Sequence, residues 1–199
     1  MTAALYPVFL KLDGLPVVVV GGGPVAAGKL DGLLVAGARV LVVAPKITHA
    51  IRVQAGPRVV LVERAFVPSD LDGARWVVAA APADVNQQVA RAAAERGLFV
   101  NAVDDTTAAT AYLGGVIRRG EALVAISTGG AAPALAGLLR EALDSLLPSE
   151  LDRWVDVAKR AREEWKRAGV PISKRRSLLL RTLVQLYRAD IVALERGAA

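Results

Sequence analysis

One stretch near the N-terminus decides the fold of this chain: Val17-Val18-Val19-Val20-Gly21-Gly22-Gly23-Pro24-Val25-Ala26. The valine run predicts a buried strand, because β-branched side chains fit a pleated surface that is covered on both faces. The strand ends at three glycines, and the residues after them favour a helix up to about Val35. A glycine-rich turn between a strand and a helix is typical of domains that hold a nucleotide diphosphate at the helix N-terminus.

This turn fits the pattern G-x-G-x-x-A through Gly21, Gly23 and Ala26. The first glycine permits the tight turn, the second lets backbone amides approach a diphosphate, and the small third residue lets the helix pack closely on the strand. The sequence therefore nominates a first set of cofactor-binding residues: Gly21, Gly22, Gly23, Pro24 and Val25. A plain tight turn without a ligand is the alternative.

Short apolar runs and helical segments alternate over the next eighty residues. Strands are predicted at 15–20, 39–43, 59–62, 76–81 and 99–103, and helices at 25–35 and 83–95. This alternation predicts an α/β fold, a Rossmann-like doubly wound parallel sheet. After residue 105 the pattern changes to two β segments at 116–118 and 122–127, a helix that Thr128-Gly129-Gly130 opens and that runs to about 147, and helix from 150 onward.

Two predicted strand ends carry further candidate residues. The second strand ends on Ala44-Pro45-Lys46, without the acid that commonly bonds the ribose hydroxyls of NAD, and Lys46 could equally favour the extra phosphate of NADP. Residue chemistry leaves that choice of cofactor open. The fifth strand ends on Asp104-Asp105, where a carboxylate could act as a general base. Alternatively, one of the two aspartates caps the next turn.

The composition limits the classes of function. The chain has 199 residues, a net charge of +6, one histidine and no cysteine, so no disulfide, thiolate zinc site, cysteine nucleophile or histidine-rich metal site is expected. No apolar run reaches the ~18 residues of a membrane span, and no secretory signal is visible, so a cytoplasmic location without membrane contact is expected. The stretch between Arg153 and Arg188 has eleven basic and three acidic side chains, a net charge of +8. Such a segment has an anionic partner or is a solvated helical face.

Together these motifs resemble the precorrin-2 dehydrogenase family, which includes the N-terminal half of bacterial siroheme synthase and bifunctional dehydrogenase/ferrochelatases. The matching segments keep the same order over most of the chain: Tyr6-Pro7-Val8-Phe9-Leu10, 20–26 with Lys29, Gly37-Ala38-Arg39-Val40, Ala79-Ala80-Ala81, Asp84-Val85-Asn86, 101–105, 124–130 and Leu146-Leu147-Pro148. In combination they are far more specific than any single motif.

The resemblance implies a function and a domain plan. It implies an enzyme, an NAD-dependent oxidoreductase that converts precorrin-2 to sirohydrochlorin in siroheme or cobalamin biosynthesis, with Asp104 as the catalytic residue and with Ala81 and Asn101 added to the cofactor site. It also implies a homodimer and three parts: an NAD-binding Rossmann domain at 1–112, a dimerisation region at 113–148 and a basic helical domain at 149–199. The carboxylates of precorrin-2 would then be what the basic segment attracts.

Two alternatives stay open at this point. Some relatives also insert iron into sirohydrochlorin, and the sequence does not decide whether this chain shares that ferrochelatase activity. A function from another class is a Rossmann-type redox sensor whose basic helices bind nucleic acid. Because the basic residues are dispersed and no helix-turn-helix pattern is found, nucleic acid is not the expected partner.

Overall fold

The computed structural model describes residues 4–197 and, within that range, the side chains up to residue 185. Arg188, the last residue of the predicted basic segment, therefore has a side chain outside the described part. The chain divides into two compact units, Met1–Gly114 with Ser127–Pro133, and Gly115–Ile126 with Ala134–Ala199. The first boundary lies close to the predicted end of the nucleotide domain at residue 112. The predicted separation of 113–148 from 149–199 stays a prediction.

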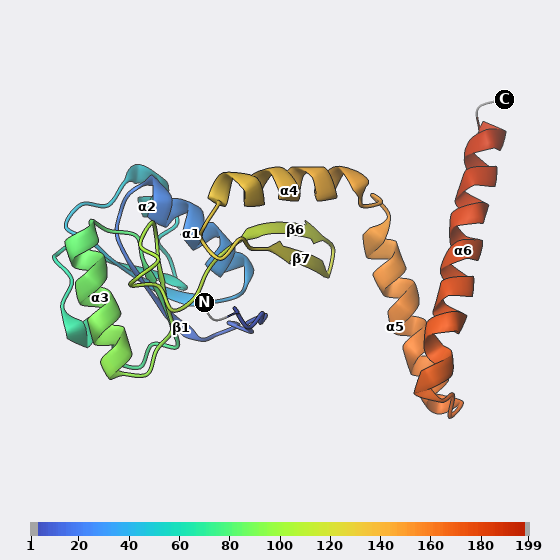
Figure 1. Ribbon diagram of the computed structural model, residues 1–199, viewed down its shortest axis with the longest axis horizontal. Helices are drawn as coiled ribbons and strands as arrows, with labels where there is room; N and C mark the ends of the chain where they lie inside the picture. Colours follow the sequence, from blue (N-terminus) through green and yellow to red (C-terminus); the bar gives the residue numbers. More distant parts are fainter. Residues whose placement is uncertain (1–3, 198–199) are drawn as a thin grey trace. The chain divides into compact units, whose positions relative to one another are not determined.

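Five parallel strands form the sheet of the first unit (Figure 1). Their order is β3-β2-β1-β4-β5, and their bounds are β1 Pro16–Val20, β2 Arg39–Val43, β3 Val59–Val62, β4 Trp76–Ala79 and β5 Val100–Ala102. The pairing register places Val18 between Leu41 and Val77, so β1 is the central strand. The predicted doubly wound sheet is confirmed: β2 and β3 are added on one side of β1 and β4 and β5 on the other, so the strand order reverses between β1 and β4 while all five strands stay parallel.

The two faces of this sheet bury alternate side chains of the valine run. Val17 and Val19 pack with the helix α1 (Pro24–Val35) and the short helix α2 (His49–Arg52), while Val18 and Val20 pack with α3 (Ala83–Glu95). Period-two alternation thus covers both faces with helices, as expected for a parallel sheet. The sequence did not predict α2, and a single 3-10 turn at Pro68–Leu71 was also not expected. His49, the single histidine of the chain, is exposed.

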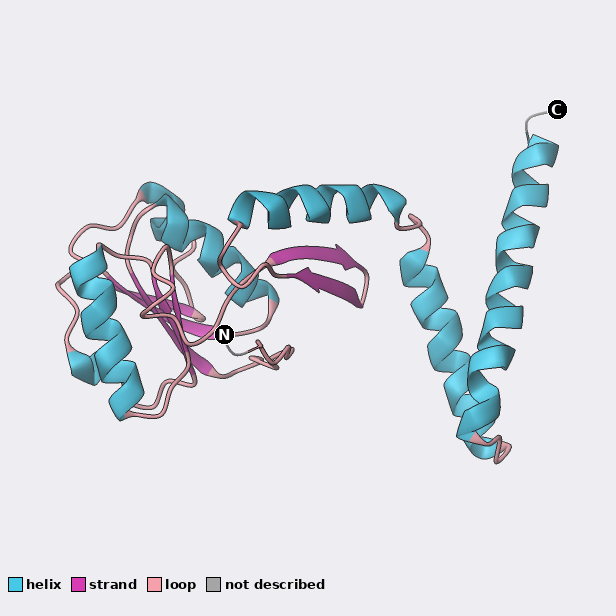
Figure 2. Ribbon diagram, in the orientation of Figure 1, coloured by secondary structure: helices cyan, strands magenta, loops and turns pink. Residues whose placement is uncertain are grey.

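The second unit is built on an antiparallel hairpin (Figure 2). Its strands are β6 (Gly115–Arg119) and β7 (Ala122–Ile126), and its helices are α4 (Pro133–Leu146), α5 (Leu151–Arg167) and α6 (Ile172–Gly197). Arg119 of β6 forms an ion pair with Asp144 of α4 at 2.6 Å, which ties the helix to the hairpin. No helix in the described range 4–197 is long and apolar enough to cross a bilayer.

One predicted helix boundary is wrong. The helix expected to open at Thr128-Gly129-Gly130 begins at Pro133, because Gly129 and Gly130 have φ values of +64° and +79°, which no right-handed helix contains. The hydroxyls of Ser127 and Thr128 accept bonds from the amides of Gly129 and Ala132, so they stabilise the turn before the helix.

The burial pattern of α1 predicts two opposite outcomes on one helix. Leu30 is fully buried, so Leu30→Ala should lower the free energy of unfolding by about 2–5 kcal/mol through lost burial and a residual cavity. Val35 is 68% exposed, and Val35→Ala should change it by less than about 0.5 kcal/mol. Urea unfolding followed by circular dichroism measures both, and equal losses would contradict this assignment of the core.

Candidate active site

In the glycine turn after β1, neighbouring backbone leaves no room for a side chain at the first two glycines, whereas the third borders open space. Gly21 has φ +132°, and a Cβ there would come within 2.2 Å of the Ala80 carbonyl oxygen. A Cβ on Gly22 would come within 2.1 Å of the Lys46 carbonyl oxygen, whereas a Cβ on Gly23 would meet no atom within 4 Å. The first two glycines are therefore required by contacts inside the protein, and the third borders free space that a ligand can approach.

The N-terminus of α1 has no side-chain cap. Gly23 is its N-cap residue, Pro24 occupies the first turn, and no acidic side chain stands in that turn. The first amides of a helix have no partner within the helix, and its dipole leaves a partial positive charge there. This end of α1 therefore suits an anion such as a diphosphate.

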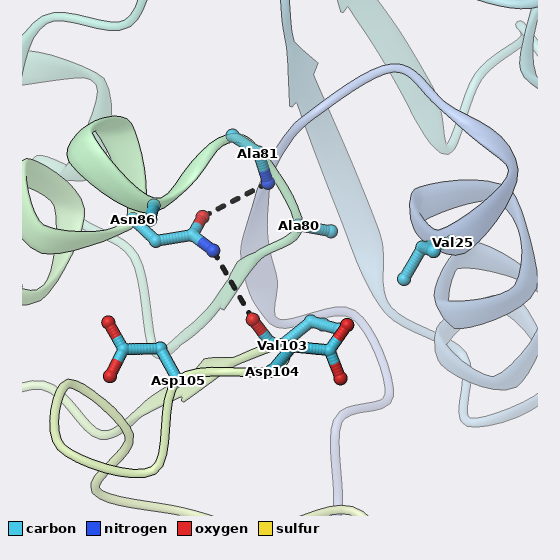
Figure 3. A pocket seen from close by; sticks show the side chains of 8 residues that line it. Val25, Ala80, Ala81, Asn86, Val103, Asp104 and Asp105 are labelled. Carbon is cyan, nitrogen blue, oxygen red and sulfur yellow. Dashed lines mark hydrogen bonds between the residues drawn. The ribbon is translucent and has the colours of Figure 1, made fainter.

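A cavity of about 200 Å³ opens at the carboxyl ends of β4 and β5 (Figure 3). Its lining combines small apolar side chains with one amide and two carboxylates: Val25, Ala80, Ala81, Ala83, Asn86, Val103, Asp104 and Asp105. Ligands of open parallel sheets bind beyond the carboxyl ends of the strands, where the strand order reverses. The cavity lies at that position, between the residues that follow β4 and the start of α1.

Asn86 fixes the shape of this cavity. Its side-chain oxygen accepts a bond from the Ala81 amide at 3.0 Å, and its side-chain nitrogen donates to the Val103 carbonyl at 3.4 Å (Figure 3). The residue is only 2% exposed, so both polar ends are bonded within the protein. Asn86 therefore joins the loop after β4 to the loop after β5.

The two aspartates after β5 have different roles. One oxygen of Asp105 accepts bonds from the Thr107 amide, the Thr107 hydroxyl and the Ala108 amide, at 3.0, 2.7 and 3.0 Å. The Thr107 hydroxyl bond, followed by the Ala108 amide bond, holds the pKa of Asp105 below its usual value. Asp105 is therefore the residue that caps the turn, as one of the two alternatives predicted for this pair.

Asp104 has no hydrogen-bond or ion-pair partner among the described residues. Its backbone has φ +57°, and it is the one non-glycine residue with positive φ in the described part of the chain. The two carboxylates point away from one another, so Asp104 presents its oxygens on a different side from Asp105 (Figure 3). An exposed carboxylate held in an unfavourable backbone conformation is a common feature of functional sites.

The structure brings some predicted site residues together and leaves others apart. The cavity lining includes Val25, Ala81 and Asp104, while Gly21, Gly22, Gly23 and Pro24 form the adjoining turn. Ala44, Pro45 and Lys46 follow β2 on the other side of that turn. Asn101 is buried within β5, where its nitrogen donates to the Ala111 carbonyl at 3.0 Å and its oxygen has no partner in the described chain.

Asn86 was missing from the predicted site. The signal that could have found it is an amide side chain in the first turns of a predicted helix, directly after a strand end with small residues. Within the described range, no group of three His, Asp or Glu side chains is arranged to hold a metal ion.

The bonds of Asn86 predict that its substitution destabilises the chain. Asn86→Ala removes both bonds and leaves buried backbone groups without partners, so the free energy of unfolding should fall by about 1–3 kcal/mol. Asn86→Asp keeps the acceptor for the Ala81 amide, but it buries a carboxylate and sets an oxygen against the Val103 carbonyl, so at neutral pH it should be at least as destabilised as Asn86→Ala. Thermal unfolding compares the melting temperatures of the wild type and the two variants. An alanine variant as stable as the wild type would contradict a stabilising role for the bonds of Asn86 to Ala81 and Val103.

The chain is similar in sequence to several known proteins. A family model described as "Putative NAD(P)-binding" matches residues 8–115. Siroheme synthase 2 of Aeromonas hydrophila subsp. hydrophila is 41% identical over 190 residues, which cover 95% of this chain and 40% of that protein. Siroheme synthase 2 of Aeromonas salmonicida is 44% identical over 187 residues, 94% of this chain and 39% of that protein. The chain thus spans about 40% of the length of the curated relatives it matches.

A solved structure covers nearly the whole chain. The structure of SirC, a precorrin-2 dehydrogenase, superposes with a TM-score of 0.72 at 28% sequence identity, and the match covers 89% of this chain and 88% of that one.

Proposed function

Because this chain belongs to the NAD(P)-binding family of SirC and the N-terminal part of siroheme synthases, we propose that it is a precorrin-2 dehydrogenase that forms sirohydrochlorin with NAD as oxidant. One observation carries the proposal: an unpartnered carboxylate, Asp104, borders a cavity that adjoins an uncapped glycine turn. The likeness to SirC, a precorrin-2 dehydrogenase, suggests the substrate.

The residues of the first unit fit a dinucleotide. Gly23 leaves free space beside the turn, and the first amides of α1 are without a side-chain cap, so the diphosphate would lie at Gly21–Val25. Ala44, Pro45 and Lys46 would lie near the adenosine, and Ala81 would complete the pocket, whereas Asn101 is buried within β5 and would support it from behind. When bound, the nicotinamide supplies the oxidising equivalent, because it takes up a hydride from a ring carbon of the substrate.

Asp104 would act on the proton that accompanies this oxidation. Removal of a hydride from a substrate carbon and of a proton from the same conjugated system adds one double bond, and a carboxylate at the site would accept the proton. An aspartate that bonds to no other described group keeps its oxygens available for that transfer. One oxygen of Asp105 already accepts three hydrogen bonds. These bonds would stabilise the turn that positions the Asp104 carboxylate.

The basic segment would assist binding of the substrate. Precorrin-2 carries acetate and propionate carboxylates, and residues 153–188 have a net charge of +8. Opposite charges raise the local concentration of an anionic substrate and the rate of its encounter with the protein. Arginine suits this task, because its planar guanidinium matches the geometry of a carboxylate.

Substitution of the free aspartate tests the proposal. Asp104→Asn should lower kcat by at least about 100-fold, because a positioned general base contributes about 10²–10⁴ in rate. Asparagine tolerates positive φ, so the variant should keep the melting temperature and the NAD affinity of the wild type. The assay follows reduced nicotinamide formed from NAD and precorrin-2 under anaerobic conditions.

Asp105→Asn is the matched comparison. It should lower the melting temperature while kcat falls less than about tenfold, because it weakens a turn and removes no proton acceptor. No turnover by the wild-type chain with either NAD or NADP would overturn the proposed function. An Asp104→Asn variant with nearly full kcat would overturn the role of this residue.

We also propose that the chain forms a homodimer through α4. One face of α4 packs on the hairpin through Ala136, and the opposite face exposes a row of leucines: Leu135, Leu138, Leu139 and Leu146. An exposed apolar stripe on a helix is typical of an interaction surface. A second copy is the simplest occupant, since most soluble oligomers are symmetric and a two-fold interface pairs a surface with itself.

Leu138→Lys tests this interface at a residue that is 64% exposed. The wild-type chain should have twice the chain mass by light scattering after gel filtration, and the variant should shift towards a single chain as protein is diluted. Val35→Lys places the same charge at a comparably exposed valine in the first unit and should leave the mass unchanged. A monomeric wild-type protein would refute the dimer.

A further inference from the structure

We propose that a groove beside α3 holds a carboxylate of the tetrapyrrole substrate, and that Arg91 is the residue that binds it. The groove has a volume of about 500 Å³ and lies between one face of α3 and the loop after β5. Its lining residues are Gln87, Ala90, Arg91, Ala94, Thr107, Ala108 and Thr110. The inference rests on the proposed function, because the carboxylate is one of those that precorrin-2 carries.

The groove adjoins the cavity of the candidate active site. On the helix wall, Asn86 lines the cavity and the next residue, Gln87, lines the groove. On the loop wall, Asp105 lines the cavity, and the three donors that bond it belong to Thr107 and Ala108, which line the groove. Asn86 and Asp105 lie on the same side of the cavity (Figure 3). A substrate that reacts in the cavity can therefore extend a carboxylate arm into the groove.

Three side chains of the groove have hydrogen-bond donors available, and no carboxylate lines it. The side-chain amide of Gln87 and the two terminal nitrogens of Arg91 have no partner among the described residues. The Thr110 hydroxyl accepts a bond from the Val100 amide at 2.8 Å, which leaves its own hydrogen free to donate. Donors of this kind around a cation suit an anion with two acceptor oxygens.

The side chain of Arg91 is directed toward the cavity end of the groove. Its Nε donates to the carbonyl of Gln87 at 3.4 Å, and Gln87 lies one helical turn nearer the start of α3. Because α3 begins at the carboxyl edge of the sheet, where the cavity lies, this bond holds the guanidinium on that side. Glu95, the acid four residues further on, pairs with Arg96 at 3.8 Å instead. Arg91 therefore offers an unpaired positive charge to the groove.

A substrate with many carboxylates needs such a charge near the cavity. The cavity lining has two carboxylates, Asp104 and Asp105, and no cation, so it would repel an anionic substrate. Arg91 belongs to the same unit of the chain as the cavity, whereas the basic segment at 153–188 belongs to the second unit. The guanidinium of Arg91 would thus offset this repulsion and fix the orientation of the substrate through one of its arms.

Titration of the full chain with sirohydrochlorin, the product, tests the groove without turnover, because the absorbance of the bound tetrapyrrole reports the complex. Arg91→Gln should raise the dissociation constant about 3- to 10-fold, the effect of losing a charged bond at an exposed site. Arg91→Lys keeps the charge without the planar fork and should lie between the two. The difference between Arg91→Gln and the wild type should shrink as salt rises, since salt screens exposed charges.

Steady-state kinetics with NAD and precorrin-2 supply a second measurement. Arg91→Gln should raise the KM for precorrin-2 by a similar factor, because the bond is made equally to the bound substrate and to the transition state. The kcat and the KM for NAD should change less than about twofold, because Arg91 lies outside the cavity and the glycine turn.

Arg75→Gln is the matched control, because it removes an exposed arginine charge just before β4, at the amino end of that strand. It should keep the affinities of the wild type, and both glutamine variants should keep its melting temperature. Equal losses in the two variants would overturn the inference, because they would show an effect of net charge alone. An unchanged dissociation constant in Arg91→Gln would overturn it as well, while turnover by the wild type leaves the proposed function intact. No turnover by the wild type with NAD or NADP would overturn the proposed function itself.

Discussion

The site depends on two positions where the protein has no room for a Cβ atom. At Gly21 the chain passes so close to the Ala80 carbonyl that any side chain would overlap it, and at Gly22 the Lys46 carbonyl imposes the same limit. These two contacts join the ends of β1, β2 and β4 at one point. Because the strand order reverses between β1 and β4, that point is also where the sheet leaves a crevice. The reversal of strand order at β1 therefore explains both features: the close packing of the glycine turn against the loops after β2 and β4, and the crevice beside that turn that a ligand can enter.

The loop after β5 gives two neighbouring aspartates different surroundings. Asp105 satisfies the amides of its turn, and this bonding stabilises the bend that places Asp104 at positive φ. A carboxylate that capped the turn could not also accept a proton at the cavity without releasing those amides. The cost of the unfavourable backbone at Asp104 is thus offset by the hydrogen bonds of the residue that follows it.

The sequence predicted the features that arise from local pattern. Short valine-rich runs located the five parallel strands to within one or two residues, since burial on both faces of a sheet leaves a direct signal in the chain. The single-turn helix at His49–Arg52 left too short a pattern to be predicted. The sequence could not decide which of Asp104 and Asp105 caps the turn, because that depends on one backbone angle and on where three donors lie. Asn86 was missed because its partners, Ala81 and Val103, come from two separate loops.

The helices α1 and α3 both begin at the carboxyl edge of the sheet, but the charge near their N-termini differs. Both lack a side-chain cap, and both have proline at or just before the first turn. However, α3 has Asp84 in its first turn, where a carboxylate interacts favourably with the positive end of the helix dipole. The first turn of α1 has no acid, and its cap residue is a glycine with open space beside it. The positive end of α3 is thus offset within the chain, whereas that of α1 is left for an anion from outside. Of the two helix ends at this edge, α1 is therefore where the diphosphate of a dinucleotide gains most from binding.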